Sequence, residues 1–377
     1  MGLYEAINAA PLYRIEAMPP RYAQFALICE NEDLESSLKS FAECSHKPFC
    51  IVPLQNDSSL GKCVEFCYAG ESQYIPVLRM EALPRLPHLE VCYYSKTQAY
   101  QPLHSVVTRL HALGLHVLYL LRPPLGISEG MRHDPSFLDR NAERLEAIYD
   151  FLADEISKQV FAARLKALLT GNMGFLFLSD YPCYAHPLVP CSSGFIVVDG
   201  GCAWGGIETF ATLVGPTGHV WGFEPDQQGF LQAQTSRSRL AHGGRVTLSH
   251  CGLWQENTVK NFSCLGSSTC VAREEYKGQT QAVSLVRLDD FVHEHGIPHV
   301  DFLKLDVEGA ECHVLEGAQQ TLSACRPNLA ICIYHNNSQD LVDVPEFIRN
   351  SDLGYRMYIG QHAANIYDTV LYAVSER

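Results

Sequence analysis

Residues 195–226 read FIVVDGGCAWGGIETFATLVGPTGHVWGFEPD and contain one strand–loop–helix–strand unit. The apolar run 195–198 is typical of a strand that is buried on both faces of a parallel sheet. A glycine-rich turn at 199–206 leads into apolar residues at helical spacing and then a GPTG stop. A second apolar run, 219–223, ends at Glu224. The unit therefore predicts an open α/β sheet whose ligand binds at the carboxyl ends of the strands.

The spacing of the glycines distinguishes two cofactors. A dinucleotide fingerprint, G-x-G-x-x-G, that starts at Gly200 would need glycine at 202, where the sequence has Cys202. The frame that fits is Asp-x-Gly-x-x-x-Gly, from Asp199 through Gly201 to Gly205. This frame is similar to the first motif of class I S-adenosylmethionine-dependent methyltransferases. It favours S-adenosylmethionine over NAD as the cofactor.

A second motif lies at 300–311, which reads VDFLKLDVEGAE. It is again an apolar strand that ends in an acid, Asp306, followed by Gly309 and a helix. Because the carboxyl ends of parallel strands meet at one edge of a sheet, Asp306 is expected to face the same crevice as the glycine loop.

These residues carry a resemblance to the FkbM family of methyltransferases. LKLDVEGAE resembles its signature, as do the loop 199–205, the triplet FEP at 223–225 and LDDF at 288–291. The similarity covers roughly residues 180–377. It implies a Rossmann-like class I methyltransferase fold with a seven-stranded mixed sheet and S-adenosylmethionine as the donor. It also implies methylation of hydroxyl oxygens on sugars, glycans or natural products, so that the partner is a small-molecule or glycan acceptor.

The residues predicted to bind the donor lie at strand ends. Glu224 is expected to accept hydrogen bonds from the ribose hydroxyls. Asp199 is expected to hold the loop and the donor's amino group, directly or through water. Residues that follow the third strand occupy the place where such folds meet the adenine. The full predicted donor set is Asp199, Gly200, Gly201, Gly205, Glu224, Pro225, Cys251, Gly252 and Asp306.

Three residues are predicted to act in catalysis. Methyl transfer to an alcohol requires alignment of donor and acceptor and removal of a proton. Asp306 is a candidate general base, metal ligand or ligand of the donor's amine. His335 follows the run LAICIY and has the ordinary pKa of a base at neutral pH. His362 is expected to approach from the closing hairpin, whereas Glu311 is interpreted as complementing a helix dipole.

Other readings stay open at this point. A divalent ion held by Asp306, His335 and a third oxygen would acidify a hydroxyl, but the spacing is no recognised metal signature and no metal site is predicted. An NAD-dependent or other nucleotide-cofactor enzyme is disfavoured by the missing fingerprint. A catalytically silent Rossmann-like binding protein is disfavoured because Asp199, Glu224 and Asp306 are intact.

Charge and composition exclude several partners. The 28 basic and 42 acidic residues give a net charge of −14, which repels nucleic-acid phosphates and anionic lipids. No window approaches the roughly 18 apolar residues of a membrane span, and no secretory signal is recognised. The 15 cysteines are odd in number and scattered, which favours reduced thiols. We therefore expect a cytoplasmic protein with no nucleic-acid partner and no membrane insertion.

Three regions are predicted along the chain. Residues 1–130 alternate strands and helices, with helices expected at 31–44 and 103–113, and are assigned to acceptor positioning or to a homodimer. Residues 131–190 form a helical connector and a loop rich in proline and tyrosine, in which Tyr181, Tyr184 and His186 are acceptor-pocket candidates. Residues 191–377 form the methyltransferase domain, with an extra hairpin within 257–288.

Overall fold

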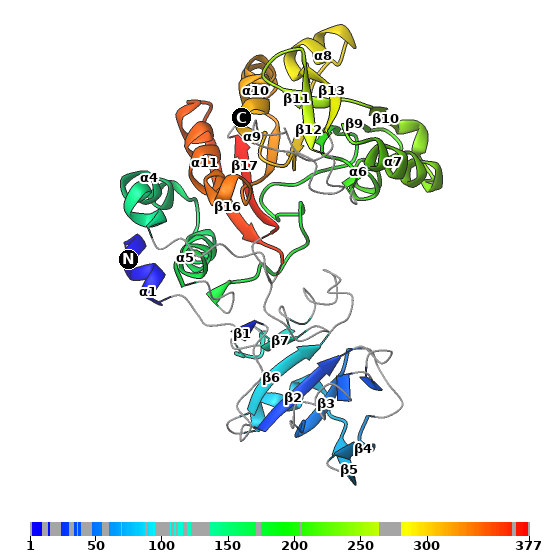
Figure 1. Ribbon diagram of the computed structural model, residues 1–377, viewed down its shortest axis with the longest axis vertical. Helices are drawn as coiled ribbons and strands as arrows, with labels where there is room; N and C mark the ends of the chain where they lie inside the picture. Colours follow the sequence, from blue (N-terminus) through cyan, green and yellow to red (C-terminus); the bar gives the residue numbers. More distant parts are fainter. Residues whose placement is uncertain are drawn as a thin grey trace. The chain divides into compact units, whose positions relative to one another are not determined.

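The computed structural model (Figure 1) describes residues 136–170, 175–203, 206–263, 280–363 and 367–375 without a break. Nearer the N-terminus it describes residues 2–9, 14–15, 24–29, 34–35, 37–38, 47–54, 60–68, 70–86, 89–94, 106, 109–110, 112–115 and 119–121. The helices expected at 31–44 and 103–113 lie largely outside the described residues.

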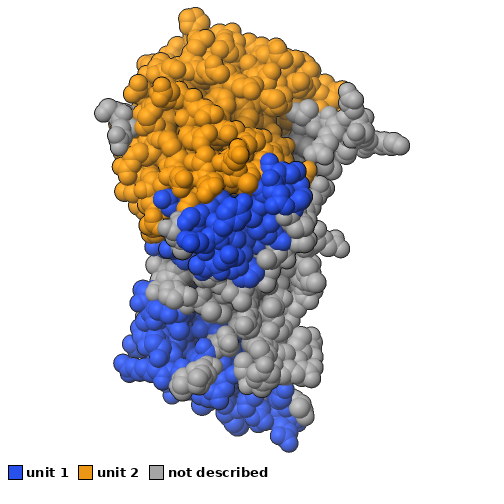
Figure 2. Space-filling view, turned by 90° about the vertical axis from the view of Figure 1, so that its left-hand side faces the viewer, with its two compact units in different colours: residues 1–140, 158–182, 361–367 blue, residues 141–157, 183–360, 368–377 orange. Residues whose placement is uncertain are grey.

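The chain separates into two compact units, coloured blue and orange in Figure 2. Unit 1 comprises Met1–Arg140, Lys158–Pro182 and Gln361–Tyr367. Unit 2 comprises Asn141–Ser157, Cys183–Gly360 and Asp368–Arg377. These units are defined by packing, whereas the three predicted regions were defined by role, so the division of roles stays a prediction.

Unit 1 contains a parallel sheet in the strand order β1-β7-β6-β2-β3. Its β2 reads QFALIC, and the two faces of this strand pack into different cores: Ala26 and Ile28 lie in one, Phe25 and Leu27 in the other. Burial on both faces explains why the strand is an uninterrupted apolar run. The strands are β1 (Arg14–Ile15), β2 (Gln24–Cys29), β3 (Cys50–Pro53), β6 (Leu89–Tyr94) and β7 (Tyr119–Leu121).

Smaller elements complete the N-terminal region. An antiparallel hairpin, which the sequence reading missed, pairs β4 (Cys63–Tyr68) with β5 (Glu71–Pro76). Helix α1 spans Leu3–Ala9, and a 3-10 helix spans Met80–Arg85.

The predicted connector contains two helices, α4 (Phe137–Phe151) and α5 (Glu155–Thr170). Asp154 precedes α5, and its Oδ1 accepts a 2.7 Å hydrogen bond from the backbone N–H of Ser157, which satisfies a donor that the first helical turn leaves open. Among the described residues no helix is both long and apolar enough to cross a bilayer.

Unit 2 is built on a seven-stranded sheet in the order β10-β9-β8-β14-β15-β17-β16. Its first five strands run parallel, and β17 runs antiparallel to β15, so the sheet is mixed, as predicted. The strands are β8 (Ile196–Gly200), β9 (His219–Phe223), β10 (Val246–Ser249), β14 (Phe302–Leu305), β15 (Asn328–Cys332), β16 (Tyr355–Gln361) and β17 (Thr369–Ser375).

Helices connect these strands. Helix α7 begins after Asp226, whose carboxylate accepts a 2.8 Å hydrogen bond from the N–H of Gly229. The helices are α6 (Gly206–Val214), α7 (Gln227–Arg239), α8 (Leu288–Glu294), α9 (Glu311–Glu316), α10 (Gln319–Cys325) and α11 (Asp340–Asn350), with 3-10 turns at Gly243–Arg245 and Asn336–Ser338.

The extra hairpin predicted within 257–288 is present. Strand β12 (Thr258–Ser263) pairs antiparallel with β13 (Thr280–Arg287). A short strand that was not predicted, β11 (Gly252–Trp254), adds parallel to β13 and makes a three-stranded sheet. The loop 264–279 lies outside the described residues.

Candidate donor and acceptor site

The register of unit 2 brings the predicted site residues to one edge of the sheet. Gly200 pairs with Phe223 on one side and with Leu305 on the other, and Phe223 pairs with Ser249. The residues that directly follow these positions are Gly201, Glu224, His250 and Asp306. Because all four strands are parallel, their carboxyl ends form one crevice, which is where open α/β sheets bind ligands.

The glycine loop is tightened by backbone contacts. Gly201 has a φ of +73°, and a Cβ at this position would lie 1.9 Å from the carbonyl oxygen of Asp306. The N–H groups of Gly201 and Cys202 both donate to the carbonyl of Phe223, at 2.9 and 3.2 Å. Only glycine allows this close approach of two strand ends. The predicted ligand Gly205 lies outside the described residues.

A buried ion pair holds the glycine loop in place. Nζ of Lys304, in the middle of β14, lies 3.0 Å from Oδ1 of Asp199, and both side chains are buried. The same ammonium donates to the carbonyl oxygens of Gly200 at 3.1 Å and Gly201 at 2.7 Å. Burial alone would lower the pKa of Lys304, but the carboxylates of Asp199 and Asp306 raise it, so the lysine is charged. Asp199 thus holds the loop through Lys304.

Glu224 follows β9 beside the glycine loop. Its Oε1 accepts a 2.9 Å hydrogen bond from the N–H of Asp226, and its carboxyl approaches the Cα of Gly229, where an added Cβ would lie 2.9 Å from Cδ. Burial raises the pKa of Glu224 to about 7, since the hydrogen bond from Asp226 offsets only part of the lost hydration. Hydrogen bonds from hydroxyl groups would compensate such a carboxyl for its lost hydration, and a ribose offers hydroxyl groups of this kind.

The residues after β10 border Glu224. Gly252 is buried, and a Cβ there would contact Pro225 at 3.6 Å and clash with Leu285 at 2.6 Å. Cys251 is half-buried, and burial raises its pKa to about 11, so it remains a neutral thiol. Apolar, neutral surroundings are compatible with an adenine, although the adenine contact itself stays a prediction for Cys251 and Gly252.

Asp306 is the centre of the acceptor side. The hydroxyl of Tyr334 donates to its Oδ1 at 2.9 Å, and the hydroxyl of Tyr184 donates to its Oδ2 at 3.2 Å. Burial raises the pKa of Asp306, but the charges of Lys304 and His335 and the bond from Tyr334 outweigh burial and lower it. Asp306 is therefore a stable carboxylate that accepts hydrogen bonds and holds a proton poorly.

His335 lies beside Asp306, as the neighbouring strands β14 and β15 predict. Its Nδ1 is 2.9 Å from Oε1 of the fully buried Glu311, and its Nε2 is 3.7 Å from Oδ1 of Asp306 and 3.5 Å from Oε2 of Glu308. Burial would lower the pKa of His335, but these three carboxylates raise it to about 10. The ring is therefore an imidazolium at neutral pH. It can act as the predicted base only when the negative charge of these carboxylates is reduced and its pKa falls.

Two turns beside His335 hold left-handed backbone. Glu308 has a φ of +54°, and Asn336, Asn337 and Ser338 have φ values of +50°, +56° and +69°. Non-glycine residues rarely adopt this conformation, and it costs about 1–3 kcal/mol per residue. The amide of Asn336 joins the two turns by donating to the carbonyl of Gly309 at 2.9 Å. Such strain is typical of functional sites.

Three predicted residues lie elsewhere. His362 belongs to unit 1, where its ring packs edge-on to Tyr181 with ring centroids 5.3 Å apart. His186 is buried between Tyr358 and Tyr372, and its Nδ1 is 3.1 Å from the N–H of Leu188. Of the three connector candidates the structure thus brings only Tyr184 to Asp306, while the catalytic role of His362 stays a prediction.

Sequence reasoning overlooked four polar residues of the site. Lys304 and Tyr334 both stand within or beside apolar runs, where a charged or polar residue is itself a signal. Asp368 precedes β17 with a φ of +57°, and burial raises its pKa to about 6, with the charge of Asp306 adding to the effect. The fourth, Glu308, was interpreted only as an acid that complements a helix dipole, although it is two residues from Asp306.

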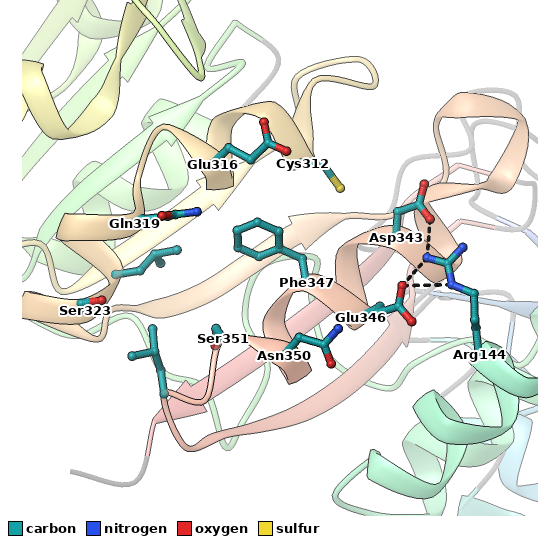
Figure 3. Close-up of a pocket in the computed structure, with 12 residues that line it drawn as sticks. Arg144, Cys312, Glu316, Gln319, Ser323, Asp343, Glu346, Phe347, Asn350 and Ser351 are labelled. Atoms are coloured by element: carbon teal, nitrogen blue, oxygen red, sulfur yellow. Dashed lines mark hydrogen bonds and ion pairs between the residues drawn. The ribbon is translucent and has the colours of Figure 1, made fainter.

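A separate pocket lies between α9, α10 and α11 (Figure 3). Its volume is about 660 Å³, and its lining includes Phe347 and Arg144, which forms ion pairs with Asp343 and Glu346. None of the residues predicted to bind the donor or to act in catalysis lines it. The candidate site is therefore the crevice at the strand ends.

Comparison with known proteins agrees with this geometry. Residues 200–357 match the family model described as the methyltransferase FkbM domain. This chain contains an FkbM methyltransferase domain. The protein is accordingly an S-adenosylmethionine-dependent methyltransferase, and the matched range includes Glu224, Asp306 and His335.

Two relatives extend the comparison. The 31-O-demethyl-FK506 methyltransferase FkbM of Streptomyces tacrolimicus is 29% identical over 185 residues, which is 40% of this chain and 70% of the relative. The crystal structure of methyltransferase FkbM from Methylobacillus flagellatus KT superposes with a TM-score of 0.51 at 20% identity, covering 98% of each chain. The second likeness shows a shared fold that includes the N-terminal part.

The chemistry of the crevice suits the FkbM domain's cofactor. S-adenosylmethionine carries a ribose and a positively charged sulfonium. Glu224 is a carboxyl beside the glycine loop and Asp306 is a stable carboxylate, which is compatible with these two groups, although the contacts with the donor stay predictions. The raised pKa of Glu224 indicates a carboxyl that lacks compensation for its lost hydration, which a hydrogen-bonding ligand would provide.

Proposed function

We propose that this enzyme transfers the methyl group of S-adenosylmethionine to a hydroxyl oxygen of a small molecule, namely a sugar, a glycan or a natural product. The observation that supports this most is Asp306, an ionised carboxylate at the end of β14 with two phenolic donors. A carboxylate held in this way accepts a hydrogen bond from an acceptor hydroxyl and orients its oxygen. The name of the Streptomyces relative, a 31-O-demethyl-FK506 methyltransferase, supports a hydroxyl acceptor.

The donor-binding roles follow from the strand ends. In this proposal Glu224 accepts from the ribose hydroxyls, and Cys251 and Gly252 border the adenine. The loop that contains Gly201 passes under the methionine part, and Asp306 faces the sulfonium. The bound donor supplies the methyl group on a positively charged sulfur, so the protein's own contribution is alignment, charge and proton removal.

Proton removal has more than one candidate. His335, with its pKa near 10, holds its proton at neutral pH, and Asp306 has a lowered pKa. Asp368, with its pKa raised to about 6, is mostly ionised at neutral pH and is a stronger base than an ordinary carboxylate. Asp368 lies near enough to Asp306 and His335 for their charges to act on it. We therefore add Asp368 to His335 and His362 as a candidate base.

Apart from the candidate base His362, unit 1 has no assigned chemistry. Its sheet has no glycine-rich phosphate loop among the described residues, and we propose that it positions the acceptor or forms a homodimer. The glycan class of acceptor belongs to the same proposal.

A transfer assay tests the proposed reaction. Purified protein is incubated with S-adenosylmethionine labelled in the methyl group and a panel of hydroxylated sugars, glycans and macrolide-type natural products. Label should enter at least one hydroxylated acceptor, and Asp306→Asn should reduce the rate strongly while the protein remains folded. Label found on an amine or carbon of the panel, with none on oxygen, would contradict O-methylation.

A further inference from the structure

The acceptor side of the site contains three side chains with metal-ligating atoms close together. Asp306, Glu308 and His335 each offer one ligand atom, and these three atoms all lie within 4.8 Å of one another. Nε2 of His335 is 3.7 Å from Oδ1 of Asp306 and 3.5 Å from Oε2 of Glu308. Ligands about 2.1 Å from an ion in tetrahedral arrangement lie about 3.4 Å apart. The two distances from Nε2 therefore approach the separation of ligands that share one ion.

Nε2 of His335 faces the carboxylates of Asp306 and Glu308. The histidine side chain is 8% exposed, and Nε2 is buried with no hydrogen-bond partner among the described residues. A buried polar atom without a partner costs about 1–3 kcal/mol, so its position calls for a ligand that the protein itself does not provide. The carboxylates of Asp306 and Glu308 are partly exposed, at 24% and 31%, so the point between the three side chains can be reached from the crevice.

Glu311 fixes the ring in the orientation that a metal ligand needs. Its Oε1 lies 2.9 Å from Nδ1 of His335 and accepts a 3.0 Å hydrogen bond from the N–H of Val307. When Nδ1 donates its proton to this carboxylate, the lone pair of Nε2 points toward Asp306 and Glu308. Metal-bound histidines commonly have such a carboxylate on the far nitrogen.

We propose that Asp306, Glu308 and His335 bind one divalent first-row transition-metal ion, with Glu311 orienting the histidine. An imidazole with two carboxylates favours Mn²⁺, Fe²⁺, Co²⁺ or Zn²⁺ over Mg²⁺ and Ca²⁺, which prefer all-oxygen ligands. The ion would take the place of the proton on Nε2.

The role of the ion rests on the proposed O-methylation. Three protein ligands leave coordination positions for the acceptor hydroxyl, whose pKa the ion lowers. The O–H bond then breaks, and the proton passes to Asp368 or water. The alkoxide oxygen forms a bond to the methyl carbon while the carbon–sulfur bond breaks, which leaves the neutral thioether of the demethylated donor.

A second cluster competes for the same ring. Glu311, His335 and Asp340 are all buried and also offer ligand atoms within 4.8 Å. Here His335 would have to bind through Nδ1, which already contacts Glu311, and Asp340 already accepts from the amide of Asn336 at 3.0 and 3.2 Å. The first cluster is favoured because its histidine nitrogen has no hydrogen-bond partner among the described residues and its carboxylates are partly exposed.

Direct binding of Mn²⁺ to the full-length protein tests the site. Chelator-treated protein without donor is titrated with Mn²⁺, and the free ion is followed by electron paramagnetic resonance. We expect one tight site per chain, a loss of affinity of at least about 100-fold in Glu308→Gln and His335→Gln, and about 10–100-fold in Glu311→Gln. His313→Gln, an exposed histidine in α9, is the matched control and should bind as the wild type does.

The outcomes separate this proposal from the proposed function. Wild-type protein that binds S-adenosylmethionine and methylates an acceptor after chelation, but shows no Mn²⁺ site, overturns the metal site alone. Equal Mn²⁺ affinity in wild type and Glu308→Gln also overturns it. Displacement of Mn²⁺ by S-adenosylmethionine would contradict the role in transfer, because the donor's own positive charge would then occupy the cluster. If His335→Gln does not fold, the wild-type titration and Glu308→Gln decide the question.

Discussion

The hydroxyl of Tyr334 donates a 2.9 Å hydrogen bond to Oδ1 of Asp306. Asp306 directly follows β14, and Tyr334 and His335 come just after Ile333, the residue that follows β15. Two adjacent parallel strands therefore bring consecutive side chains to one carboxylate. Burial raises the pKa of Tyr334, which keeps the phenol neutral and a donor at any physiological pH. Tyr334 thereby fixes the carboxylate that, in our proposal, orients the acceptor.

Tyr334→Phe should therefore reduce turnover without a comparable loss of donor binding. A hydrogen bond to a charged group contributes about 1.5–3 kcal/mol, so we expect kcat to fall about 10–100-fold while the Kd for S-adenosylmethionine changes by less than about threefold. Tyr355→Phe is the control, since the Tyr355 hydroxyl donates a 2.9 Å bond to the carbonyl of Pro327 at the start of β15. It should lose stability but keep its kcat. Equal effects of both substitutions on kcat would contradict a special role for Tyr334.

The pair of Lys304 and Asp199 should matter mainly for folding. Lys304→Met leaves the buried carboxylate of Asp199 without its partner, and we expect the free energy of unfolding to fall by about 3–5 kcal/mol in urea titrations. Lys260→Met is a suitable control, because Lys260 on β12 contacts the ring of Trp254 near the surface and its loss should cost less than about 1 kcal/mol.

A double substitution refines this prediction. Lys304→Met combined with Asp199→Asn should cost less than the sum of the two single changes, since it removes the orphaned charge. Strictly additive losses would show that the two residues act independently.

Gly201→Ala should be far more costly than alanine at another left-handed glycine. Gly354 has nearly the same backbone, with a φ of +70°, but an added Cβ there meets no atom within 4 Å. Gly354→Ala should cost about 1–2 kcal/mol from backbone strain alone. Gly201→Ala adds the clash with the carbonyl of Asp306 and should cost about 3–5 kcal/mol, with loss of donor binding. Similar thermal stabilities for the two variants would refute the close approach of the strand ends.

If Glu224 binds the ribose, Glu224→Gln should have opposite effects on the stability of the donor-free protein and on its affinity for the donor. Its pKa is about 7 in the folded state and 4.5 as the ordinary value, so the native protein binds more protons between these limits. Ionisation of this residue therefore lowers the free energy of unfolding as pH rises from about 4.5 to 7, and the loss persists above pH 7. Glu224→Gln should raise the free energy of unfolding of the donor-free protein by about 1–3 kcal/mol at pH 8 and have little effect at pH 4.5.

The same variant should bind S-adenosylmethionine more weakly. Loss of an ionised acceptor for the ribose hydroxyls should cost about 1–3 kcal/mol of donor affinity, measured by calorimetry at pH 8. A variant that is destabilised at pH 8, or one that binds the donor as tightly as the wild type, would contradict the assignment of Glu224.

Much of unit 2 was predictable because its strands are buried on both faces. Runs such as 195–198 have no polar residue to obscure them, and parallel register then places the residues after each run together. That reasoning brought Asp306 and His335 to one crevice. It missed the pair β4 and β5, whose partly exposed strands lack such a run, and it missed β11, which is buried but has only three residues.

The polar contacts of the site were less predictable. Glu311 does lie in the first turn of α9, which fits its interpretation as a complement to the helix dipole, but its carboxylate also contacts His335. That contact depends on the turn at 336–338, whose three left-handed residues follow no local preference beyond asparagine. Likewise, nothing in the spacing of Lys304 and Asp199 indicates an ion pair across 105 positions, which only the register of β8 and β14 creates.

In our proposal, this FkbM domain methylates a hydroxyl oxygen of its acceptor, and Asp306 orients that oxygen. The most direct measurement is the structure determination by NMR of a product made with methyl-¹³C S-adenosylmethionine, compared for wild type, Asp306→Asn and Tyr355→Phe. The account predicts a labelled methyl bonded to oxygen, formed at similar rates by wild type and Tyr355→Phe and about 10²–10⁴-fold more slowly by Asp306→Asn. A labelled methyl on nitrogen or carbon, or undiminished O-methylation by folded Asp306→Asn, would contradict it.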